Sequence, residues 1–194
     1  QEGVNIAICG RTLETLNDTV EELKKHNVKA IGVVADVTDA NSLTKFHEEA
    51  VSDFGPVDIL INNAGGHVSR SDINEVSVED FKSTFDLNLF AGFQLMQEVI
   101  PGMRDNHWGR IINIASIWGR EYGGTISYMS SKAALIGATK HAAVTLGKDG
   151  ILVNSIAPGS IEHPGGSWER FKSENTQDVV DSFIAQNLPL GTFG

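Results

Sequence analysis

The sequence predicts an α/β fold built on a doubly wound parallel sheet with helices on both faces. Short runs rich in β-branched residues alternate with longer amphipathic stretches along the chain, which is the pattern of successive strand–helix units. The strand runs are apolar at consecutive positions, as expected for strands buried on both faces. With 194 residues and no long apolar run, the chain is interpreted as one domain, residues 1–194.

Each element is predicted from its local pattern. Strands are expected at 4–9, 30–36, 57–62, 109–115 and 151–157, where Val, Ile and Leu gather between turn-forming residues. Helices are expected at 12–26, 39–54, 77–103 and 125–147. Asp39 is suited to cap the second helix. The segment 159–194 is richer in Gly, Pro and polar residues, so it is predicted to form a mobile substrate flap.

Composition narrows the class of protein. The single cysteine, Cys9, excludes an internal disulfide and a cysteine-rich metal site. The sequence has no signal peptide and no apolar stretch long enough to span a membrane, so we expect a cytoplasmic protein with no membrane partner. A net charge of −10 argues against a nucleic-acid partner. The six histidines show no metal-ligand spacing, so no metal site is predicted, although His163 could line a pocket.

The two ends of the sequence suggest that elements are missing. Gly3 suits the position just after a helix whose body is absent, and "NLPLGTFG" ends on turn-like residues. The expected sheet therefore lacks its first β-α unit, of about 30 residues, and its last strand. Without that first strand, the remaining strands would form two separate groups with exposed edges. One group would contain 4–9 and 30–36, and the other would contain 57–62, 109–115 and 151–157.

Ligands of doubly wound sheets bind beyond the carboxyl ends of the strands. Polar, glycine or proline residues follow all five predicted strands: Gly10-Arg11-Thr12, Asp36-Val37, Asn63-Ala64-Gly65-Gly66, Ser116-Ile117 and Pro158-Gly159. Any one of these is an ordinary loop, but their joint occurrence favours one continuous binding rim.

Four motifs in order carry a family resemblance: "INNAG" at 61–65, Ser116, "YMSSK" at 128–132 and "APG" at 157–159. Tyr128 and Lys132 alone, four positions apart, are a weak motif. Together with the asparagine–glycine loop, a serine twelve positions before the tyrosine and the later Pro-Gly, they are specific. The chain resembles the short-chain dehydrogenase/reductase family over nearly its whole length, and its last residues look like those of 3-oxoacyl-carrier-protein reductases and of sugar or alcohol dehydrogenases.

This resemblance implies a Rossmann-like fold and a nicotinamide-dependent enzyme that interconverts a carbonyl and an alcohol of a small molecule. Tyr128 would be the general acid/base, Lys132 would lower its pKa, and Ser116 would hydrogen-bond the substrate oxygen. Asn88 matches the family's asparagine that holds a water for a proton relay. The alternative for Asn88 is a helix asparagine bonded to nearby backbone.

The resemblance also implies the cofactor contacts. Asn63, Ala64 and Gly65 would lie against the adenosine ribose, Asp36 and Val37 against the adenine, and Pro158, Gly159 and Ile161 around the nicotinamide, beside Tyr128 and Lys132. Arg11 stands where an acidic residue would bind a ribose hydroxyl, so NADP(H) is preferred and NAD(H) is possible. Asp36 and Arg11 could instead be solvated surface residues. The family's glycine-rich pyrophosphate turn is not in the sequence.

Substrate and assembly stay open. Residues 117–124 and 160–190 are expected to form the substrate wall, where Trp118, Tyr122, Trp168 and Phe171 fit either an aromatic substrate or ordinary packing. Family members pair their two long helices, which implies a homodimer or homotetramer, whereas a monomer with one buried helix is the alternative. A catalytically silent cofactor sensor, or a truncated scaffold, is the alternative function.

Overall fold

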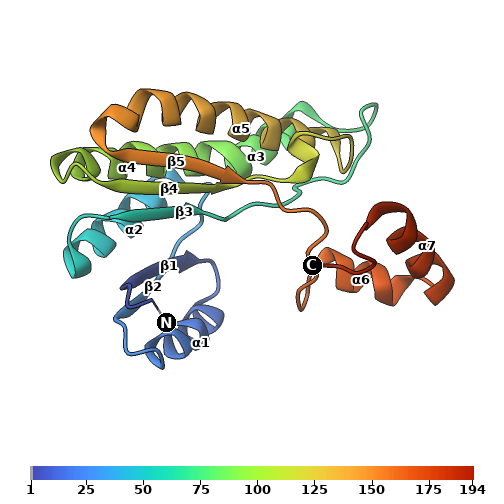
Figure 1. Cartoon of the computed structure of the whole chain (residues 1–194), viewed down its shortest axis with the longest axis horizontal. Helices are drawn as coiled ribbons and strands as arrows, with labels where there is room; N and C mark the ends of the chain where they lie inside the picture. The colour runs from blue at the N-terminus through green and yellow to red at the C-terminus, as the bar shows by residue number, and fades with distance from the viewer. Residues whose placement is uncertain (1) are drawn as a thin grey trace. The chain divides into compact units, whose positions relative to one another are not determined.

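A computed structural model describes residues 2–194 (Figure 1), and Gln1 lies outside the described residues. The chain divides into two compact units, one ending at Ile156 and the other comprising Ala157–Gly194. The first unit contains parallel strands flanked by helices, which confirms the predicted α/β class. The second unit contains two short helices.

The first strand pair is β1 (Ile6–Gly10) and β2 (Ala30–Val34), which run parallel with Ile6 opposite Ala30. They are joined by α1 (Leu13–Lys24), whose Leu16 and Val20 are buried. Leu16 packs against Gly10 and Val20 against Gly32. Because these two glycines carry no Cβ, the helix can approach the strands closely.

The second sheet contains β3 (Ile59–Asn62), β4 (Gly109–Ile114) and β5 (Ile151–Ile156), all parallel in the order β3-β4-β5. It is separate from the β1-β2 pair, which confirms the two groups of strands predicted from the sequence. A cavity of about 1220 Å³ is lined by residues of both β1 and β3. The unpaired edges of these two strands therefore border the same space.

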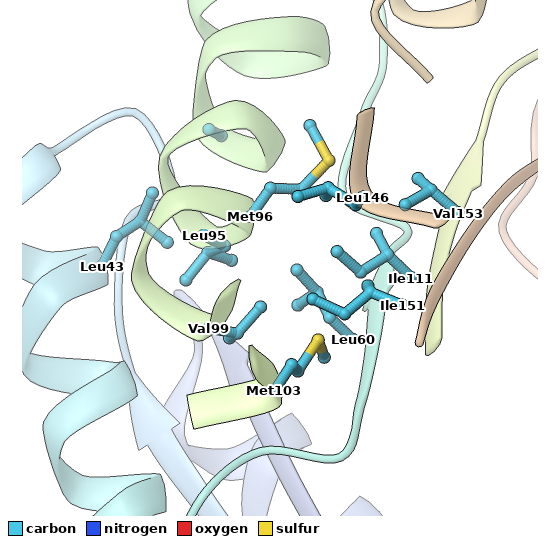
Figure 2. Close-up of a cluster of buried hydrophobic side chains, with 11 residues drawn as sticks. Leu43, Leu60, Leu95, Met96, Val99, Met103, Ile111, Leu146, Ile151 and Val153 are labelled. Carbon is cyan, nitrogen blue, oxygen red and sulfur yellow. The ribbon is translucent and has the colours of Figure 1, made fainter. Parts of the chain in front are cut away.

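The hydrophobic core lies between the three-stranded sheet and α4 (Ala91–Asp105), as Figure 2 shows. Met103, Ile111 and Ile151 are completely buried there. Leu43 of α2 (Ala40–Phe54) joins this cluster, and Asp39 caps α2 by accepting from the Asn41 N–H. On the opposite face of the sheet four side chains are exposed, namely Ile59, Ile61, Leu152 and Ile156. One face of this sheet thus supplies the core.

The stretch predicted as one helix over 77–103 has three parts. Ser77 caps α3 (Val78–Phe85), a π-helical turn follows at Asp86–Phe90, and α4 continues from there. In the π turn the Ala91 N–H reaches back to the Asp86 carbonyl. The wider turn accommodates an extra residue, a local feature that is frequent at functional sites, and it contains the buried Asn88.

The helix predicted over 125–147 is α5 (Ile126–Leu146), which packs on β5, on α3 and on the π turn. It follows β4 through the short 3₁₀ turn Ile117–Gly119, and Thr125 caps it by accepting from the Tyr128 N–H. After its end, Gly150 has φ of 78° and a Cβ there would collide with the His107 carbonyl. Only glycine fits at this turn into β5.

The second unit contains α6 (Ser167–Glu174) and α7 (Gln177–Asn187). Trp168 packs against Phe171, Phe183 and Phe193, with ring centroids 5.0–5.8 Å apart. The sequence interpretation missed both helices, because glycine and proline precede α6 and the whole segment was interpreted as a flap. Trp168 and Phe171 form an aromatic cluster inside this unit.

Candidate active site

Three of the four predicted catalytic residues lie where β4 passes into α5. Ser116 follows β4 and is 8% exposed, and its Oγ accepts from the Trp118 N–H at 3.2 Å. Tyr128 lies in the first turn of α5 and is half-buried, and its phenol is near enough to the Ser116 side chain for the serine to affect the phenol pKa. Lys132 follows one turn later on the same face of the helix. The strand end and the helix start therefore place the three residues together.

Lys132 is almost completely buried, with 3% exposed. Its Nζ donates to the Ile114 carbonyl at 2.7 Å and lies 5.7 Å from the centroid of the Tyr128 ring. Burial lowers the pKa of the ammonium group to about 8, because the charged form loses its hydration. Near pH 8 the site thus contains both the charged and the neutral amine.

The pKa of the Tyr128 phenol moves in the direction opposite to the sequence expectation. Burial raises this pKa above its ordinary value, and the interaction with the Ser116 side chain only partly opposes the shift. In the chain without ligands the phenol pKa therefore lies above its ordinary value, and the lowering of this pKa by Lys132 stays a prediction. The physical reason is that the phenol loses hydration, while the Lys132 Nζ bonds to backbone rather than to the phenol oxygen.

Both polar atoms of the Asn88 side-chain amide form hydrogen bonds with the backbone of one residue, Gly66. Its Oδ1 accepts from the Gly66 N–H at 2.9 Å, and its Nδ2 donates to the Gly66 carbonyl at 2.8 Å. A Cβ on Gly65 would lie 2.7 Å from Asn88 Oδ1 and 3.0 Å from Lys132 Nζ. The asparagine–glycine loop, the π turn and α5 are therefore in contact, and only glycine fits at position 65.

His67 is a residue of this cluster that sequence reasoning missed, since the histidines were considered as metal ligands and only His163 was singled out as able to line a pocket. Its ring stacks on the Tyr128 ring, with centroids 4.2 Å apart and planes 22° apart. Trp118, expected in the substrate wall, meets the same tyrosine edge-on at 6.3 Å. No local sequence signal reveals the histidine contact, because it joins a loop to a helix far along the chain.

Five of the eleven predicted cofactor residues line one cavity of about 530 Å³. Its lining includes Arg11, Asp36, Val37, Ala64 and Gly65. The cavity lies at the carboxyl ends of β1, β2 and β3, as expected for a doubly wound fold. Ser83 and Asp86 also line it and were missed, because they lie inside a predicted helix.

The remaining cofactor predictions fall elsewhere. Asn63 lines the larger cavity of about 1220 Å³, together with Asn62 and Asn88. Pro158, Gly159 and Ile161 belong to the second unit, so their contribution to a nicotinamide site stays a prediction. Asp36 already accepts two hydrogen bonds from Thr38, at 2.9 and 2.7 Å, which lower the pKa of its carboxyl.

Residues 2–194 contain no group of three or more His, Cys, Asp and Glu side chains arranged to hold a metal ion. None of the helices described in that range combines the length and the apolar character needed to cross a bilayer.

A Ser–Tyr–Lys cluster at the carboxyl edge of a parallel sheet is the arrangement of the short-chain dehydrogenases. The family model described as short chain dehydrogenase matches residues 1–174. The chain belongs to the short-chain dehydrogenase/reductase family, whose members are NAD(P)-dependent oxidoreductases. The resemblance inferred from the sequence is confirmed.

Several relatives cover the whole chain. The chain is 31% identical to the (2S)-[(R)-hydroxy(phenyl)methyl]succinyl-CoA dehydrogenase subunit BbsD of Thauera aromatica, over 75% of that protein. It is 32% identical to the 3-oxoacyl-[acyl-carrier-protein] reductase FabG of Staphylococcus aureus, over 76% of that protein. The chain thus spans about three quarters of these relatives.

Solved structures show the same fold. The structure of an NAD+-bound xylitol dehydrogenase matches the whole of this chain over 78% of the dehydrogenase chain, with a TM-score of 0.88 and 29% identity. The structure of a variant of actinorhodin polyketide ketoreductase with NADPH matches the whole of this chain over 76% of the ketoreductase chain, with a TM-score of 0.90 and 30% identity. Both nicotinamide cofactors occur among these neighbours.

Proposed function

We propose that this chain interconverts a carbonyl and an alcohol of a small molecule by hydride transfer, with Tyr128 as the general acid/base. The observation that carries the proposal is the proximity of Ser116, Tyr128 and Lys132. The Ser116 side chain acts on the Tyr128 phenol, and the buried Lys132 Nζ lies 5.7 Å from the centroid of the tyrosine ring. A nicotinamide cofactor, when bound, supplies or accepts the hydride. All other steps fall to residues of the chain.

In the reducing direction, the Tyr128 hydroxyl donates its proton to the carbonyl oxygen as negative charge develops there. The Ser116 hydroxyl donates a hydrogen bond to the same oxygen and stabilises that charge. The Lys132 ammonium favours the phenolate left behind. In the oxidising direction, the phenolate removes the proton from the alcohol.

Asn88 is proposed to serve the proton relay through its backbone rather than its side chain. Both polar atoms of its amide are bonded to Gly66. The widened π turn changes the pairing of nearby carbonyls, so a backbone carbonyl in this turn is the candidate to hold a relay water. In this role the side chain positions the loop.

We propose that the smaller cavity holds the adenosine end of the cofactor. Gly65 lines this cavity without a side chain, and the Ala64 and Val37 side chains offer small apolar contacts. Arg11 provides a guanidinium suited to a 2′-phosphate, and β1 ends without an acidic residue. We therefore propose NADP(H) as the preferred cofactor, with NAD(H) as the alternative.

The substrate proposal begins with acyl thioesters, because FabG and BbsD are named for carrier-protein and CoA thioesters. A polyol or ketose is the second class to test, since a xylitol dehydrogenase has the same fold. The predicted homodimer or homotetramer and the predicted cytoplasmic location stay predictions.

The test combines an activity screen with one substitution. NADPH and NADH oxidation are measured with acetoacetyl-CoA, xylulose and an aromatic ketone, for the unsubstituted protein and for Tyr128→Phe. The substitution removes only the phenol oxygen, so turnover should fall by about 10²–10⁴-fold, while NADPH binding followed by fluorescence is retained. Tyr122→Phe, at a tyrosine that is 95% exposed, is the matched control: it removes the other phenol oxygen of the chain and should keep most of its kcat, even if a place in the substrate wall changes its KM.

A Tyr128→Phe variant that retains its rate would show that the assigned acid/base is wrong. NADPH binding without turnover on any of the three substrate classes would favour the cofactor-sensing alternative.

A further inference from the structure

His67 lies in the loop that follows β3, directly after Gly65 and Gly66. Its imidazole is half-buried and lies nearly parallel to the Tyr128 phenol, with a centroid separation of 4.2 Å. This is a stacking distance. One face of the tyrosine ring is therefore covered by a side chain from a different part of the sheet edge.

A hydrogen bond fixes the histidine to the start of α5. His67 Nδ1 lies 3.2 Å from the Thr125 hydroxyl. The same hydroxyl oxygen accepts from the Tyr128 N–H at 3.4 Å, since Thr125 caps the helix. The histidine thus contacts both the ring of Tyr128 and the residue that holds the tyrosine backbone.

A second aromatic ring and a cation complete the surroundings of the phenol. Trp118 meets Tyr128 edge-on, at an interplanar angle of 83°. Gly123 and Gly124 pack against the Trp118 indole with no room for a Cβ atom, so the indole is confined. The Lys132 Nζ lies 5.7 Å from the phenol centroid.

We propose that His67 is a positioning residue for Tyr128, which holds the phenol ring flat against the imidazole and shields one of its faces from water. The proposal rests on the proposed function, because it gives that function's acid/base a fixed orientation. Misplacement of a reacting group by about 1 Å can cost about 10²-fold in rate.

The charge state of His67 fits this role. Burial, and secondly the nearby Arg70, lower the pKa of the imidazole below its ordinary value. At neutral pH the ring is therefore uncharged. It covers the phenol without placing a positive charge on it, which agrees with the raised pKa of Tyr128.

The two tyrosines of the chain allow a direct spectroscopic test. In a Tyr122→Phe background, the ultraviolet absorption of the phenolate reports the ionisation of Tyr128 alone. His67→Ala should admit water to the covered face of the phenol, so the Tyr128 pKa should move down. His67→Phe keeps a stacked ring and should return the titration toward that of the parent.

Turnover is measured on the same variants with the substrate found in the activity screen. His67→Ala should lower kcat by about 10–100-fold with the NADPH dissociation constant unchanged, and His67→Phe should restore most of the loss. An unchanged Tyr128 titration in His67→Ala overturns the proposal, as does a His67→Phe variant that behaves like His67→Ala.

The titration needs no turnover, so the two proposals fail separately. If the parent chain lacks activity but the phenolate titration shifts as expected, the proposed function fails and the positioning role stands. Circular dichroism of each variant establishes that the comparison is made on folded protein.

Discussion

The Lys132 ammonium is held in a nearly dry environment, beside the strand end that carries Ser116. Within residues 2–194, its one hydrogen bond is to the Ile114 carbonyl. A neutral acceptor compensates only part of the hydration that a charged amine loses on burial. Hence the charged form, which the proposed mechanism needs, costs stability.

This cost predicts a pH-dependent stability. Lys132 loses its proton near pH 8 in the folded chain and near 10.5 when unfolded. Between these values the unfolded state binds more protons, so stability rises with pH. Relative to Lys132→Met, the free energy of unfolding should rise by up to about 3 kcal/mol across this window, as measured by urea unfolding.

Lys140→Met removes an exposed lysine from the same helix and controls for the lost charge. A stability difference between the starting chain and Lys132→Met that stays flat across the window would contradict the burial of a charged amine.

The adjacent glycines 65 and 66 give a matched pair of substitutions. A Cβ at Gly65 would press on Asn88 and Lys132, whereas a Cβ at Gly66 would meet only Leu87, at 3.9 Å. Gly65→Ala should destabilise the chain by about 1–3 kcal/mol and weaken NADPH binding. Gly66→Ala should change neither thermal unfolding nor binding, and equal effects of the two would show that the crowding at position 65 is not real.

At this scale the sequence was informative where chemistry is local. Tyr128 and Lys132 are one helical turn apart, so their relation is visible in the spacing. The direction of the Tyr128 pKa shift and the contact with His67 could not be predicted from the sequence, because both depend on which distant segments cover the phenol.

At the scale of elements, a buried polar chain links β3, β4 and α5. Asn62 donates to Asn113 Oδ1 at 2.8 Å, and Asn113 Nδ2 donates to Thr139 Oγ1 at 2.9 Å. The Thr139 hydroxyl in turn donates to the Leu135 carbonyl at 2.7 Å. Since Asn113 is completely buried, this series of hydrogen bonds holds the strands and the helix in one register.

A double-mutant cycle tests this series of buried hydrogen bonds. Asn113→Ala should cost about 1–3 kcal/mol for each buried group left without a partner, and Thr139→Val should cost less. Because the two residues bond to each other, their effects should deviate from additivity by about 0.5–3 kcal/mol in denaturant unfolding. Asn154→Ala, at an exposed asparagine of β5, should stay within about 0.5 kcal/mol.

Additive costs for Asn113→Ala and Thr139→Val would mean that the bond between these residues contributes nothing to the stability of the fold.

Elements with strong local patterns were predicted within a few residues, and α5 and β4 are examples. The π turn at Asp86–Phe90 was not predicted, because the apolar pattern through it is also compatible with a continuous α-helix. The helices of the second unit were missed for a different reason, because their segment is rich in glycine, proline and polar residues. Their apolar residues form the cluster around Trp168, which exists only once α6 and α7 pack together.

At the scale of the whole molecule, the first unit contains two parallel sheets rather than one. The cavity lined by β1 and β3 lies where the edges of these sheets have no strand partner, and unpaired edges expose backbone hydrogen-bonding groups. All predicted catalytic residues belong to the first unit, and Pro158, Gly159 and Ile161 to the second.

The sequence by itself determined the α/β class, the order of strands and helices, and the identity of Ser116, Tyr128 and Lys132, because periodicity and short motifs are written locally in the chain. Only the tertiary structure decided that His67 covers the Tyr128 ring, that Asn88 binds Gly66, and that burial shifts the pKa values of Tyr128 and Lys132. These properties arise from contacts between segments far apart in sequence, and from the water that such contacts exclude.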